Sequence, residues 1–101
     1  MTIDKKTEIE LEAAVFRRLR AHLLARSDVQ NIDMMNLTGF CRNCLANWYQ
    51  DAAKDHGIVL EKAEAREIIY GEPFVDWQAK HQKEATPEQK AAFATAAKSH
   101  G

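Results

Sequence analysis

The sequence predicts an all-α protein of about five helices, packed as a compact orthogonal array or bundle. Apolar residues recur at helical spacing along the chain, and no alternating apolar run is long enough for a strand. Only 4 Gly and 2 Pro interrupt the chain of 101 residues. A hydrophobic content of 46% is enough for one hydrophobic core. We therefore expect a single helical domain over residues 1–101.

The first helix is expected to start at a cap formed by Asp4 or Thr7 and to end near Ala25. Its apolar side chains cover a wider arc than the single stripe of a surface helix. Its length would be about 33 Å, whereas a 100-residue domain has a radius of gyration of about 13 Å. We therefore expect burial on two sides, by the rest of the chain and by a second copy of it. The second helix is its expected main packing partner, and the protein is expected to be a homodimer.

The later elements are placed by their start and stop signals. A polar connection is expected over residues 27–36, and helices are expected from Thr38 to His56, from Glu61 to Tyr70, from Pro73 onward, and over residues 86–99. Gly57 and Gly71 are the expected stops. The last helix begins with the capping box Thr86-Pro87-Glu88-Gln89. It is rich in Ala, with Phe93 as its one large apolar anchor, so we expect weak packing.

Cys41 and Cys44 are the most distinctive pair because their i, i+3 spacing places both thiols on one helix face. That face also carries Trp48, which favours a core position for both cysteines. One alternative is a zinc site with His22 as a further ligand. The other is a redox dithiol near a helix N-terminus. Because the chain has no second Cys-x-x-Cys pair and no strand–helix–strand context, no cofactor is predicted, and zinc remains the alternative.

Charge and composition argue against several classes of protein, namely nucleic-acid binders, membrane or secreted proteins, and enzymes. The 14 basic and 15 acidic residues balance to a net charge of -1, so no nucleic-acid partner is expected. No apolar run approaches the roughly 20 residues that a membrane span needs, and no signal peptide is visible, so a cytoplasmic location is expected. No phosphate loop or nucleophile elbow is present, which argues against an enzyme. An anion site at Arg42 and Arg66 is a further alternative.

One stretch of the chain carries a family resemblance. It comprises Asn36-Leu37-Thr38-Gly39-Phe40-Cys41-Arg42-Asn43-Cys44-Leu45, then Trp48-Tyr49, Glu64-Ala65-Arg66-Glu67, Tyr70-Gly71, Pro73 and Trp77. These residues resemble the bacterial family known as domain of unknown function 1244. The resemblance runs from the first helix to about Thr86, although Glu72-Pro73-Phe74 stands where the family pattern has Met-Pro-Tyr.

The resemblance implies a short, all-helical, dimeric bacterial protein and no assigned activity. The shared motif forms either a structural core or a site, and it maps onto Phe40, Cys41, Arg42, Asn43, Cys44, Trp48, Arg66, Glu67, Tyr70 and Trp77. Together with the wide apolar arc of the first helix, it favours a non-enzymatic interaction or scaffold module that acts as a homodimer. The alternative function is metal binding or redox chemistry at Cys41 and Cys44.

Overall fold

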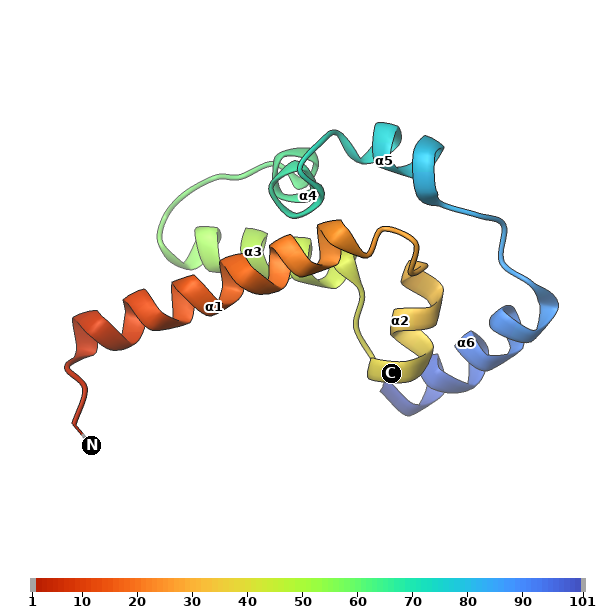
Figure 1. Ribbon diagram of the computed structural model, residues 1–101, viewed down its shortest axis with the longest axis horizontal. Coiled ribbons are helices and arrows are strands. Elements are labelled where there is room, and N and C mark those ends of the chain that lie inside the picture. Colours follow the sequence, from red (N-terminus) through yellow and green to blue (C-terminus); the bar gives the residue numbers. More distant parts are fainter. Residues whose placement is uncertain (1, 101) are drawn as a thin grey trace.

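The computed structural model describes the backbone of residues 2–100 and the side chains of residues 2–96. Within that range the protein is all-helical and contains no strand (Figure 1). The six helices are α1 (Lys5–Ala25), α2 (Asn31–Thr38), α3 (Arg42–Asp55), α4 (Lys62–Tyr70), α5 (Phe74–His81) and α6 (Pro87–His100). The fold class is therefore confirmed, and the count of helices is six instead of about five. No described helix combines the length and the apolar character that a membrane span requires.

The extra helix comes from a break that the sequence analysis did not predict. Thr38 is the last residue of α2, where its Oγ1 donates to the carbonyl oxygen of Met34 at 2.7 Å, so it does not cap a following helix. Gly39 adopts the left-handed conformation with φ 83°, which ends α2. Cys41 is then the N-cap of α3. A glycine directly after Thr38 is a helix stop, and here that signal overrides the capping tendency of threonine.

Other helix ends lie where local signals predict them. Asp4 caps α1 by accepting a hydrogen bond from the backbone N–H of Thr7 at 2.7 Å. Gly71 ends α4 in the left-handed conformation, with φ 74°. Thr86 and Gln89 form the expected capping box, in which each side chain accepts from the other's backbone N–H, at 3.1 Å and 2.8 Å. Caps and stops that act within four residues were therefore predictable.

The buried core is small and lies between α3, α4 and α5. Its members are Leu45, Ala46, Ala65, Ile69, Tyr70 and Trp77. The closest helix packing is between α3 and α4, so the prediction that the first helix is the main partner of α3 is wrong. Ala46 and Ala65 are each 1% exposed, and such small side chains permit the close approach of the two helices. Phe16 and Leu23 of α1 pack only against the edge of this core.

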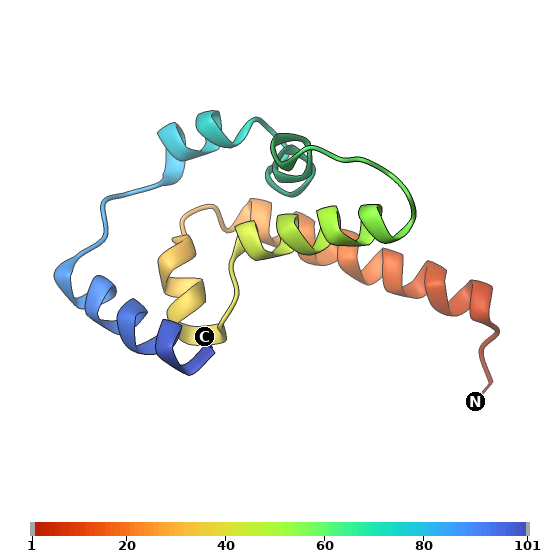
Figure 2. The same ribbon diagram turned by 180° about the vertical axis from the view of Figure 1, so that it is seen from behind.

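Helix α1 extends beyond the core. None of its 21 residues is buried, and its N-terminal half projects past α3 (Figures 1 and 2). The chain measures 49 × 31 × 27 Å with a radius of gyration of 15.6 Å. Its accessible surface is 7429 Å², whereas a compact monomer of this mass exposes about 5,800 Å². The fold therefore leaves an unusually large surface in contact with solvent.

Helices α2 and α6 lie side by side at the end of the molecule opposite the N-terminus (Figure 1). Their polar contacts run from Asn36 Nδ2 to the Gln89 carbonyl oxygen at 3.2 Å and from Gln89 Nε2 to Asp33 Oδ1 at 2.9 Å. Phe93, the expected apolar anchor, is 40% exposed. The side chains of residues 97–99 of the expected last helix lie outside the described residues.

Trp77 is the largest fully buried side chain, and its ring contacts Tyr70 at 4.9 Å between centroids. Replacing it by alanine should lower the free energy of unfolding by about 3–5 kcal/mol, because the cavity cannot refill. Val75 on the same helix is 68% exposed, so Val75→Ala should change the stability by less than about 0.5 kcal/mol. Urea unfolding followed by circular dichroism measures both. Equal losses in the two variants would contradict the position of the core.

Candidate functional site

Arg42, the first residue of α3, is buried where α1 ends. Its guanidinium donates to the carbonyl oxygens of Arg26 at 2.7 Å, Val29 at 2.8 Å and Leu23 at 3.5 Å, and to Asn31 Oδ1 at 2.9 Å. The side chain is 2% exposed, and its guanidinium carbon lies 5.0 Å from the centroid of the Trp77 ring. The end of a helix leaves carbonyl oxygens without partners. Arg42 therefore acts as a remote cap for the C-terminus of α1.

The charge of Arg42 is balanced by dipoles and not by a close carboxylate. Burial lowers the pKa of Arg42 from its ordinary value, although a guanidinium stays protonated in a protein. The partial negative charge at the end of α1 favours a cation there. Because both terminal nitrogens are occupied by protein oxygens, Arg42 offers no anion site, alone or with Arg66.

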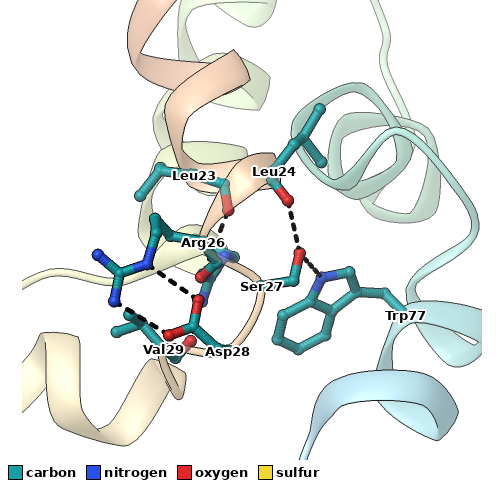
Figure 3. A network of polar contacts seen from close by, with 8 residues as sticks. Leu23, Leu24, Arg26, Ser27, Asp28, Val29 and Trp77 are labelled. Carbon is teal, nitrogen blue, oxygen red and sulfur yellow. Dashed lines mark hydrogen bonds and ion pairs between the residues drawn. The ribbon is translucent and has the colours of Figure 1, made fainter.

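The loop after α1 is held from a second side by Trp77 (Figure 3). The indole Nε1 donates to Ser27 Oγ at 3.3 Å, and Ser27 Oγ donates to the carbonyl oxygen of Leu24 at 2.9 Å. On the exposed side Arg26 and Asp28 form a two-point ion pair, with both contacts at 3.0 Å. The loop is thus clamped between an indole ring and the buried guanidinium.

A chain of hydrogen bonds continues from Arg42 into the core. Asn31 accepts from Arg42 and donates through Nδ2 to Tyr70 Oη at 3.0 Å. Tyr70 Oη donates in turn to Asn43 Oδ1 at 2.7 Å. Burial raises the pKa of Tyr70 to about 12, because the phenolate would lose its hydration there. The phenol therefore stays protonated and acts as a fixed donor and acceptor.

Three sulfur atoms lie together at the break between α2 and α3. Cys41 Sγ is 4.0 Å from Cys44 Sγ, and Cys44 Sγ is 3.8 Å from Met35 Sδ. Cys41 is 7% exposed, and Cys44 is half-buried. Burial raises the pKa of the Cys41 thiol, an effect that the backbone N–H groups of Cys44 and Asn43 partly oppose. Both cysteines are free thiols.

The helix face predicted to carry the cysteines toward the core is observed in part, because Cys41 is buried as predicted and Cys44 is half-buried. The buried positions of α3 are Arg42, Leu45 and Ala46, whereas Trp48 is 56% exposed and stacks on Phe40 at 6.0 Å between centroids. The prediction assumed a continuous helix from Thr38. The break at Gly39 gives α3 its own orientation, and the buried Arg42 faces the end of α1.

The remaining predicted residues do not join this cluster. Arg66 stacks over the Phe74 ring, with its guanidinium carbon 4.7 Å from the centroid, and its buried Nε has no hydrogen-bond partner. Glu67 is exposed, and so is His22 on α1. No three His, Cys, Asp or Glu side chains among the described residues are grouped so that they could hold a metal ion. Within one chain His22 therefore does not complete a site with the two cysteines.

Three residues that the sequence analysis passed over are central to the observed contacts. Asn31 joins Arg42 to Tyr70, Ser27 receives the indole of Trp77, and Met35 contacts Cys44. All three lie in the stretch predicted as a polar connection. A capping serine and an asparagine within it are compatible with many loops, so no spacing rule singles them out.

The comparisons with known proteins agree with the motif. Residues 29–95 match a family described as "Protein of unknown function (DUF1244)". The matched range is about two thirds of the chain and contains every motif residue from Phe40 to Trp77. A comparison with curated proteins found no match.

If Arg42 caps α1, removing its guanidinium should strongly lower the free energy of unfolding. Arg42→Met should lower the free energy of unfolding by about 3 kcal/mol or more, because buried carbonyl oxygens lose their only charged donor. Arg42→Lys should not restore it, since an ammonium lacks the planar fork. Arg26→Met is the control, because it removes an exposed ion pair and should leave the urea midpoint almost unchanged. A stable Arg42→Met protein would contradict the capping role.

The raised pKa of Tyr70 predicts a loss of stability in alkali. The unfolded phenol ionises near pH 10, whereas the folded one ionises at about 12, so the folded state holds its proton longer. The stabilisation is complete below pH 10 and disappears as the pH rises toward 12. Between pH 9 and pH 11 Tyr70 should contribute a loss of about 1 kcal/mol.

Urea unfolding at both pH values measures this effect as the difference between the wild type and Tyr70→Phe, which lacks the ionising group. Tyr49→Phe is the matched control, because Tyr49 is 38% exposed, and this variant should keep the wild-type pH dependence. Identical pH slopes in the wild type and in Tyr70→Phe would contradict the assignment.

Proposed function

The chain belongs to the DUF1244 family of proteins of unknown function, and we propose that it is a non-enzymatic interaction module that acts as a homodimer. In this dimer the α1 helices of two copies pair antiparallel. The proposal is carried by a second apolar stripe on α1 that no described residue of the chain buries.

The two stripes of α1 lie on different sides of the helix. Phe16 and Leu23 pack against the edge of the core. The second stripe lies roughly a quarter turn away and consists of Leu11, Val15 and Leu19, at positions i, i+4 and i+8. These side chains are 50%, 68% and 36% exposed. A regular apolar row at this spacing is the pattern by which one helix packs against another.

The charges of α1 favour an antiparallel arrangement. A twofold axis at Val15 would place Leu11 opposite the partner's Leu19 and Glu12 opposite the partner's Arg18. Neither Glu12 nor Arg18 forms an ion pair within the described part of the chain. A parallel arrangement would instead align acidic residues with acidic ones and basic with basic. Charge complementarity therefore supports a second copy as the occupant of this stripe.

The exposed area is also sufficient for a stable dimer. The chain exposes roughly 1,600 Å² more than a compact monomer of its mass. A standard interface buries about 800 Å² on each partner. The surplus surface of the chain is thus larger than one partner's share of such an interface.

The polar contacts around Arg42 support a structural role for the motif and not a catalytic one. Arg42, Asn31, Tyr70 and Asn43 hydrogen-bond to one another or to backbone carbonyls. Groups that are satisfied by fixed partners hold helices in place. This supports a rigid platform that presents α1.

The dimer predicts that a charge at the centre of the stripe will separate the two copies. Val15→Glu should raise the dissociation constant about a hundredfold or more, since two like charges would face each other in an apolar contact. Val75→Glu is a matched control with the same side chains and the same 68% exposure on α5, and it should remain dimeric. Light scattering during size-exclusion chromatography measures the mass. A monomeric wild type at micromolar concentration would refute the proposal.

Charge reversal tests the antiparallel register separately. Glu12→Arg and Arg18→Glu should each weaken the dimer, because each places like charges opposite one another across the axis. The double variant restores opposite charges at both positions and should recover most of the affinity. Double-variant affinity no better than that of either single variant would contradict this register.

A further inference from the structure

We propose that Met35, Cys41 and Cys44 form a binding site for a soft monovalent cation, Cu(I), held by three sulfur atoms. This site lies within one chain, at the break between α2 and α3, and it does not depend on the proposed dimer.

Two sulfur–sulfur separations at this break match those of a three-coordinate metal. In a trigonal plane, metal–sulfur bonds of about 2.3 Å place the sulfurs roughly 4.0 Å apart. The observed separations are 4.0 Å between Cys41 Sγ and Cys44 Sγ and 3.8 Å between Cys44 Sγ and Met35 Sδ. A linear two-coordinate ion would need about 4.6 Å between its two ligands. The pair is therefore too close for linear coordination and suits three ligands.

The donor set selects the metal. Thiolate and thioether sulfurs are soft ligands and favour Cu(I), whereas zinc takes four ligands from thiolates, imidazoles and carboxylates. The described residues offer no third His, Cys, Asp or Glu beside the two cysteines. Met35 is the third donor instead, and a thioether suits Cu(I) better than Zn²⁺.

The local fold brings these side chains together for a definite reason. Gly39, in the left-handed conformation, turns the chain between α2, which carries Met35, and α3. Cys41 is then the N-cap of α3, and Cys44 is at its third position. The partial positive charge at the start of this 14-residue helix favours the negative charge that two bound thiolates bring.

Binding exchanges protons for the metal. One Cu(I) joins both thiols and the thioether, two protons leave to solvent, and the bound complex carries one negative charge. Nothing is oxidised or reduced in this step. Because binding releases these protons, the apparent affinity should rise with pH.

An anaerobic titration tests the proposal. Cu(I) is delivered as its acetonitrile complex and competed against bicinchoninate, and we expect one Cu(I) for each chain. Cys41→Ser and Cys44→Ser should each abolish this binding. X-ray absorption at the copper edge should show three sulfur neighbours at about 2.3 Å. Two sulfur neighbours, or binding below one equivalent, would overturn the proposal.

Methionine variants separate a three-sulfur site from a simple thiol pair. Met35→Leu keeps an apolar side chain of similar volume and should weaken Cu(I) binding at least about tenfold. Met34→Leu is the matched control, because Met34 is the adjacent buried methionine, and its affinity should equal that of the wild type. Circular dichroism confirms that each variant is folded. Unchanged affinity in Met35→Leu, or Zn²⁺ that displaces Cu(I), would refute the site.

The Val15→Glu variant separates Cu(I) binding from dimerisation. The three sulfurs belong to one chain, so a monomeric Val15→Glu protein should bind Cu(I) as tightly as the wild type. Binding that is lost together with the dimer would show that the ligands come from two copies, and it would overturn the single-chain site.

Discussion

The fold depends on the contact between a buried guanidinium and the carbonyl oxygens that end α1. Arg42 is the only described charged side chain that is fully buried, and it has no close carboxylate partner. Isolated buried charges are costly unless hydrogen bonds replace their hydration. Four oxygens do so here, and the Trp77 ring covers the remaining face. One side chain therefore fixes the relation of α1 to α2, α3 and α5.

This constraint explains why three of the motif residues lie together. Tyr70 lies beside Arg42 through Asn31, and Trp77 contacts both of them. Asn43, Tyr70 and Trp77 are thus the motif residues tied to this charge, and the core itself is small. The sulfur cluster is held by contacts of its own, in which Cys44 Sγ lies 4.0 Å from Cys41 Sγ and 3.8 Å from Met35 Sδ.

Local signals were predictable, and long-range ones were not. Asp4, Gly71 and the Thr86–Gln89 capping box act within a few residues, so their patterns identify them directly. The inward position of Arg42 arises from partners 11 to 19 residues away. Hydrophobic periodicity predicts that an arginine faces solvent. The pattern contains no information about carbonyl oxygens that another helix supplies. The cysteine pair was predictable because its spacing is local. Met35 and Asn31 were not, because their partners lie in another helix.

The small core and the exposed α1 both follow from the limited apolar surface that this chain buries. A domain of about 100 residues gains little stability unless it buries most of its apolar surface. This chain buries the contact of α3 with α4 and α5 but leaves Leu11, Val15 and Leu19 in solvent. A helix without a buried residue frays unless its last turn is held in place. The Arg42 cap secures that last turn, so α1 stays directed outward with its second stripe available for an equivalent helix.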